Sequence, residues 1–245
     1  MNRVISVQTQ LLETQAALAR LTQSIRDNPG SKSLHLMAES LEKRHRNLEA
    51  EFLAEAEAIG VDVCSYRLLP NDDSSSPIKA IAGALVGFQT LVSVVYDALR
   101  TAKPRERRRI SPAIAQQTSF NFGYSFAGSV GIVLTIPNER LLGFESKLDE
   151  SLKLVFKMAG AKTSADVKNF ADIVGLASIK ALFDWAKTHS DYRMGADITW
   201  RRDRLVRSSF FAEPPLFDDL SKIISETSEE SSEPFEAIGV ITAAD

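Results

Sequence analysis

Hydrophobic and polar residues alternate in two runs between Thr118 and Ile136. In the first run, every second residue is aromatic: Phe120, Phe122, Tyr124 and Phe126. This period of two is typical of a half-buried strand. The alternation resumes after the glycine-containing triplet 127–129, so the pattern predicts two strands joined as a β-hairpin. Because an isolated hairpin is only marginally stable in water, we expect the aromatic row to pack against neighbouring helices.

The first 60 residues show helical periodicity instead. Apolar side chains recur every seven residues at Val4, Leu11, Leu18 and Ile25, which is the spacing of an apolar helical seam. Residues 27–30 include proline and glycine and end this helix, and a second apolar helix follows. Helices joined by so short a turn run antiparallel. Residues 1–60 are therefore predicted to form a coiled-coil-like helical hairpin, whose seam either meets a partner subunit or covers the core of its own domain.

The most apolar helix is predicted to begin after Ser76-Pro77, a helix-starting pair, and to end before Pro104. Apolar residues cover most of its circumference, so we expect it to be central. Gly83 and Gly87 lie four residues apart and predict a packing notch, which we assign to the aromatic hairpin. A strand over residues 61–69 precedes this helix, with the single cysteine, Cys64, as a small buried residue.

Further helices and a second pair of strands are predicted between residues 148 and 225. The whole pattern predicts an α+β fold, in which an N-terminal antiparallel helical hairpin is followed by a small antiparallel sheet covered by helices. We expect the α+β domain to span residues 61–225. Residues 226–234 are serine- and glutamate-rich and predict a flexible acidic linker. Residues 235–245 alternate again, and we interpret them as the start of a further β element in preference to an added strand of the same sheet.

Charge is unevenly distributed along the chain. The whole chain carries a net charge of −3, but residues 213–245 carry a net −8, which leaves +5 for the first 212 residues. The densest basic cluster follows the central helix: Arg105, Arg107, Arg108 and Arg109. Arginine binds phosphate oxygens in a bidentate way, so the cluster is a candidate polyanion site, although cations also favour a helix C-terminus without any ligand. A second basic group lies at residues 193–207, and the sequence does not show whether the two groups share a face.

Catalytic and metal-binding patterns give little support to an enzyme. The stretch Gly123-Tyr124-Ser125-Phe126-Ala127 is similar to the nucleophile elbow of the α/β-hydrolases. That motif requires a strand, a sharp turn and then a helix, whereas here a second strand follows. The three histidines, at positions 35, 45 and 189, do not have metal-ligand spacing. We therefore expect no catalytic constellation, no metal and no cofactor.

These observations lead to three functional hypotheses. The first is a non-enzymatic scaffold or protein-interaction module that forms homo-oligomers through its N-terminal helices. The alternative is a nucleic-acid or polyanion-associated protein that uses the arginine cluster. An enzyme with a pocket beneath the helices is the third. Because the chain has no long apolar run, no signal-peptide pattern and one cysteine, we expect it to be cytoplasmic and not associated with a membrane.

Overall fold

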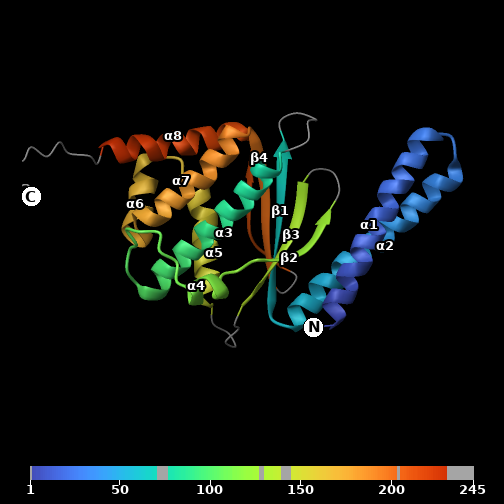
Figure 1. The fold of residues 1–245 in the computed structure, drawn as a ribbon, viewed down its shortest axis with the longest axis horizontal. Helices are drawn as coiled ribbons and strands as arrows, with labels where there is room; N and C mark the ends of the chain where they lie inside the picture. The colour runs from blue at the N-terminus through green and yellow to red at the C-terminus, as the bar shows by residue number, and fades with distance from the viewer. Residues whose placement is uncertain (1, 71–76, 127–129, 139–144, 203–204, 231–245) are drawn as a thin grey trace, which may run out of the picture.

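A five-stranded antiparallel sheet separates the molecule into two layers of helices (Figure 1). The structure is a computed structural model and describes residues 2–70, 77–126, 130–138, 145–202 and 205–230. The strand order is β2-β3-β1-β4-β5. In sequence, the strands are β1 (Val61–Pro70), β2 (Asn121–Phe126), β3 (Val130–Pro137), β4 (Met194–Arg202) and β5 (Leu205–Ala212). The long central strand β1 pairs with β3 on one side and with β4 on the other.

One face of the sheet, called the inner face here, is covered by most of the helices. These are α3 (Ile78–Thr101), α5 (Lys147–Ala159), α6 (Ser164–Val174), α7 (Leu176–Asp191) and α8 (Pro214–Glu230), with the short α4 (Pro112–Gln117) beside them. The opposite, outer face meets only the hairpin of α1 (Asn2–Asp27) and α2 (Lys32–Ala58) among the described elements. The predicted α+β fold, with an N-terminal helical hairpin and a helix-covered antiparallel sheet, is confirmed.

The main core lies between the inner face and the helical layer. Cys64, Tyr66 and Leu68 point inward from β1 and are almost completely buried, as the period of two requires. Helix α3 packs against α5 and α7, and ten of its residues are buried. By length and composition α3 is the one described helix that could cross a membrane, and 44% of its apolar window is buried in the molecule.

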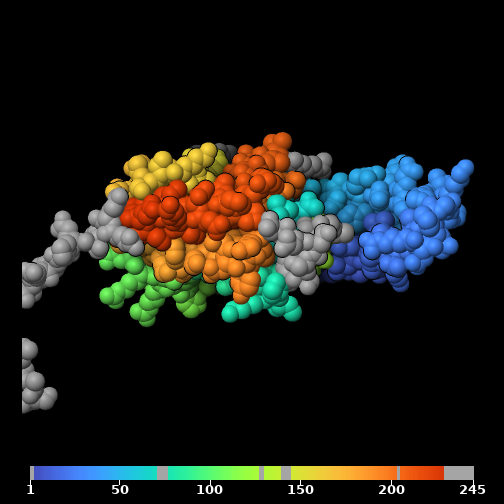
Figure 2. Space-filling model, turned by 90° about the horizontal axis from the view of Figure 1, so that it is seen from above, coloured from blue at the N-terminus to red at the C-terminus, as the bar shows by residue number. Residues whose placement is uncertain are grey.

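The α1–α2 hairpin attaches by one end and projects away from the body (Figure 1, and the blue helices of Figure 2). A small second cluster holds this end, with Val7 and Leu11 from α1 and Phe52 and Ala56 from α2. These side chains pack against Val63, Tyr124 and Val133 on the outer face of the sheet. The rest of the hairpin makes contact mainly between its own two helices.

The aromatic row does not share one face, which corrects the prediction from strict alternation. Phe120 stacks on Phe88 of α3, with ring centroids 5.6 Å apart, whereas Phe122 is 55% exposed. Tyr124 lies on the outer face against Phe52. The reason is a β-bulge between Phe122 and Tyr124, because one extra residue in a strand reverses the parity of everything that follows.

The two glycines of α3 form a packing notch, but against a different partner from the one predicted. A Cβ at Gly87 would lie 3.1 Å from Trp185 Cδ1, and one at Gly83 would lie 2.9 Å from the methyl group of Thr188. Both neighbours belong to α7. The missing side chains therefore allow α7, rather than the aromatic hairpin, to approach α3 closely.

Helix α8 extends further than the sequence pattern suggests. It ends at Glu230, so the first five residues of the predicted acidic linker are helical. The remainder of that linker and the predicted final β element, residues 231–245, lie outside the described residues.

Candidate functional site

The predicted oligomer seam lies mostly between the two helices of the hairpin. Leu11 is fully buried in the second cluster, while Val4, Leu18 and Ile25 are half-buried along α1. Leu21, from the intervening positions of the same helix, is also buried. Use of this seam by a partner subunit stays a prediction.

The distal part of the hairpin exposes apolar side chains that no other described element covers. Leu36 and Met37 of α2 are 66% and 56% exposed, near the turn that joins the two helices. An exposed pair of this kind on a projecting arm is a candidate contact surface. We call Leu36 and Met37 the arm patch.

Two of the four arginines predicted as a polyanion site are engaged within the fold. Arg105 pairs with Asp97, with Nε and Oδ2 2.7 Å apart, and Arg108 pairs with Asp184, with Nη1 and Oδ2 2.6 Å apart. The main chain of Arg105 also accepts a hydrogen bond from the N–H of Ala177. These contacts attach the basic loop to α3 and α7.

The other two arginines of the cluster, Arg107 and Arg109, are exposed and pair with no acidic side chain among the described residues. Two arginines of the second basic group do not extend this surface. Arg201 donates to the Ser65 hydroxyl, which lies on the outer face of the sheet, and Arg202 turns inward. Arg204 is outside the described residues. Polyanion binding therefore stays a prediction that depends on Arg107 and Arg109.

A buried polar network connects one end of the sheet to α5. Asn138 Nδ2 donates to Asp62 Oδ2 at 2.8 Å and to Asp149 Oδ1 at 2.7 Å. Arg202 Nη1 donates to Asp149, and Trp200 Nε1 donates to Asp62 at 3.1 Å. This network was not predicted from the sequence, because its members are far apart in the chain. Its one local signal is the spacing of Ser146 and Asp149, a capping box at the start of α5.

The pKa values of the two carboxylates in this network shift in opposite directions. Burial raises the pKa of Asp62, although hydrogen bonds from Asn138 and Trp200 act against it. Burial also acts on Asp149, but hydrogen bonds from the Ser146 backbone N–H, Asn138 and Arg202 outweigh it and hold its pKa below the usual range. Asp149 therefore carries the charge that pairs with Arg202. Asn138 and Ser146 also line a polar hollow of about 440 Å³ beside α4.

A second buried polar group lies in the main core. His189 Nδ1 is 3.0 Å from the carbonyl oxygen of Met194, so this nitrogen donates and Nε2 accepts from the Tyr66 hydroxyl at 2.8 Å. Trp185 Nε1 donates to the same hydroxyl oxygen. Phe217 stacks on the imidazole, with centroids 4.2 Å apart. Burial lowers the pKa of His189 to about 4 and raises that of Tyr66, so both groups are neutral and act as structural parts of the core.

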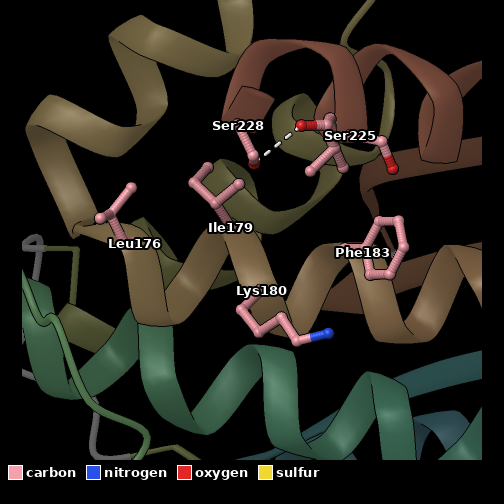
Figure 3. Close-up of a pocket in the computed structure, with 7 residues that line it drawn as sticks. Leu176, Ile179, Lys180, Phe183, Ser225 and Ser228 are labelled. Atoms are coloured by element: carbon pink, nitrogen blue, oxygen red, sulfur yellow. Dashed lines mark hydrogen bonds between the residues drawn. The ribbon is translucent and has the colours of Figure 1, made fainter. Parts of the chain in front are cut away.

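An open groove of about 550 Å³ runs between α7 and α8 (Figure 3). Its floor is apolar and its rim carries one ammonium group and two hydroxyls: Leu176, Ile179, Phe183 and Ile224 form the apolar part, and Lys180, Ser225 and Ser228 the polar part. Ile179 and Ile224 are buried, while Leu176 is 64% exposed. The sequence predicted both helices as amphipathic but did not show that their apolar stripes leave a space between them.

The strands around the hydrolase-like stretch exclude a nucleophile elbow at Ser125. Ser125 lies within β2 and pairs with Ile132 of β3, so a strand follows it rather than a helix. His189 is enclosed in the main core with its Nε2 already bonded to Tyr66. Among the described residues, no group of three or more His, Cys, Asp or Glu side chains could hold a metal ion.

Comparison of the chain with known protein families, curated proteins and solved structures finds no match.

Proposed function

We propose that the protein is a non-enzymatic interaction module that self-associates through the distal part of its α1–α2 hairpin. The observation that supports this proposal is the attachment of the hairpin by one end only, with the arm patch of Leu36 and Met37 left exposed at the other. Helices of 26 and 27 residues are each about 40 Å long at ~1.5 Å per residue, which is more than the contact with the sheet requires.

Packing physics favours a second hairpin as the partner. Two helices alone bury one seam, and a pair of hairpins from two copies buries further surface by forming a four-helix arrangement. A symmetric contact of this kind uses the same patch on both copies. Burial of each Leu or Met side chain contributes roughly 1.5–3 kcal/mol.

The buried titratable groups of the described core also fit a structural role. Tyr66 and His189 hydrogen-bond to each other, and Asp62 and Asp149 share Asn138 as a donor. In both places the polar atoms are directed at one another inside the core. Such mutually satisfied groups specify a single packing arrangement.

Sedimentation velocity over a wide concentration range tests the proposal. We expect the native chain to dimerise, and we expect the double substitution L36E/M37E to weaken the dimer by about 100-fold or more, because it places two charges from each copy in the contact. The matched control S6E/N47E adds the same charges at exposed polar positions of the hairpin away from the arm patch and should leave association unchanged. A native chain that stays monomeric at the highest concentration would refute self-association, and equal weakening by both variants would refute the arm patch.

A further inference from the structure

Strand β5 forms an open edge of the sheet. It lies at the end of the strand order and pairs with β4 alone among the described strands. The other edge strand, β2, has a β-bulge between Phe122 and Tyr124 and contacts α1. Proteins protect edge strands with bulges, proline, charges or a covering element, because unpaired backbone N–H and C=O groups can pair with another chain. β5 contains no proline, and its pairing with β4 is regular over residues 208–212.

This open edge carries an exposed aromatic side chain. Phe211 is 61% exposed on the outer face of the sheet, whereas Phe210, the preceding residue, is buried in the main core. Ser209 shares the outer face with Phe211, because side chains alternate along a strand, and it is also exposed. An open edge of this kind is a surface to which a further strand can be added.

The charges at the two ends of the regular segment make β5 complementary to itself. Arg207 precedes this segment and Glu213 follows it, and both residues are exposed. In an antiparallel pair, residues that lie opposite one another share a face of the sheet. A two-fold pairing of two copies centred on Phe210 meets this condition, and it places Arg207 of each copy opposite Glu213 of the other.

The position of the two-fold axis follows from these charges. A shift of the axis to Ser209 or to Phe211 keeps the faces matched but removes both Arg–Glu pairs. With the axis at Phe210, the Phe211 side chains of the two copies are diagonal neighbours and can cover each other. Exposed ion pairs contribute little to affinity, so the Arg–Glu pairs mainly select the register, while the open backbone groups and the Phe211 rings supply the contact.

We propose that β5 pairs in the antiparallel sense with β5 of a second copy, centred on Phe210, so that the two sheets join into one continuous sheet. The contact is separate from the arm patch of Leu36 and Met37 and does not depend on association of the hairpins. A chain that uses both contacts links more than two copies, because each contact uses a different patch of the same molecule.

Sedimentation velocity of the L36E/M37E chain at high concentration tests this pairing without the hairpin contact. We expect this chain to retain a dimer. R207E and E213R should each weaken that dimer by about 10-fold, because each substitution places like charges opposite one another at both ends of the segment. The double variant R207E/E213R should restore the affinity to within about threefold. An equimolar mixture of the two single variants should do the same, since Arg and Glu again lie opposite one another in the mixed dimer.

Two matched variants in the same background test the exposed aromatic side chain. F211E should weaken the dimer by at least ~10-fold, because it brings two carboxylates together across the axis. F122E changes a phenylalanine that is 55% exposed on the other edge strand, and it should leave the dimer unchanged. Equal weakening by F211E and F122E would overturn the proposal.

Two further results would also overturn the pairing of β5 with its copy. The first is an L36E/M37E chain that stays monomeric at the highest attainable concentration, which would leave the hairpin contact of the native chain unaffected. The second is a mixture of R207E and E213R that associates no better than either variant alone. Restoration by the double variant without restoration by the mixture would show that Arg207 and Glu213 pair within one copy.

Discussion

The two faces of the sheet are held in different ways. The inner face packs against α3, α5, α7 and α8 in a continuous core that includes both tryptophans, Trp185 and Trp200, and two buried polar groups. Among the described elements, the outer face meets one end of the α1–α2 hairpin, and eight buried apolar residues form the contact. The inner face therefore builds the domain, and the outer face attaches an arm to it.

Polar contacts differ between the faces as much as apolar ones. Buried hydrogen bonds of 2.7–3.1 Å join Asp62, Asn138, Asp149 and Trp200 on the inner side. On the outer side Tyr124 donates to Glu49 at a longer 3.4 Å. Regions with few buried contacts open with smaller free energies than the core of the same protein. We therefore expect the hairpin to detach from the sheet more readily than the inner core unfolds.

Gly175 is the position where a single methyl group should have the largest effect. Its φ is +85°, and a Cβ there would lie 2.2 Å from the backbone nitrogen of Arg105, which crosses in front of α7. We expect G175A to lower the free energy of unfolding by more than ~4 kcal/mol, because neither the strained backbone nor the crossing chain can relax easily. Denaturant unfolding measures this loss.

Gly30 in the hairpin turn provides the control for that substitution. Nothing lies within 4 Å of a Cβ built there. G30A should therefore change the free energy of unfolding by less than ~0.5 kcal/mol. Similar losses for G175A and G30A would contradict the close crossing at Arg105.

Substitution of Phe52 tests whether the structures on the two faces of the sheet unfold separately. Its ring packs edge-on against Tyr124, with centroids 5.2 Å apart, in the cluster that holds the arm. Truncation to alanine should cost roughly 3 kcal/mol. We expect F52A to reduce hydrogen-exchange protection in α1 and α2 while α3 keeps its own, and F88A to reduce protection in α3. Equal loss of protection in α3 for the two variants would show that the faces form one cooperative unit.

His189 in the inner core should make the free energy of unfolding depend on pH. Its pKa is lowered to about 4 in the fold, against 6.5 for the unperturbed side chain, so between these values the unfolded chain binds a proton that the folded chain does not. The contribution of neutral His189 to the free energy of unfolding is therefore present above pH 6.5 and is lost as the pH falls towards 4. From pH 6.5 to pH 5 the loss is about 1.5 kcal/mol.

The variant H189Q isolates this contribution, since glutamine does not titrate. Chemical denaturation at several pH values should show a shallower pH dependence for H189Q than for the native chain. The comparison between the two chains removes the shared effect of other groups, including Asp62, whose raised pKa acts in the opposite sense. Parallel pH profiles would contradict the burial of a neutral imidazole.

Element types were predictable because their periods are local. The helical hairpin, the strand 61–69, the hairpin formed by β2 and β3, and the second strand pair all match the pattern of the sequence. The burial of Cys64 followed from its place in an alternating strand. The capping box of Ser146 and Asp149 is a local feature that was not predicted, and its link to Asp62 depends on the fold.

Errors arose where the sequence had to specify which faces meet. The bulge at Gly123 reversed the parity of the aromatic row, so Tyr124 packs on the arm rather than on α3. The notch of Gly83 and Gly87 was recognised correctly but assigned to the wrong neighbour. The groove between α7 and α8 and the pairing of Arg105 and Arg108 with Asp97 and Asp184 depended on helices that come together only in the fold.

The sequence by itself determined the helices, the strands and the charge asymmetry of this protein, because each depends on residues that are near one another in the chain. Only the tertiary structure decided which arginines pair with carboxylates, which apolar side chains stay exposed and which carboxylates have a raised pKa. Those properties depend on desolvation and on distances between segments such as β1 and β4, whose paired residues Cys64 and Trp200 are far apart in the sequence. No local pattern encodes that separation.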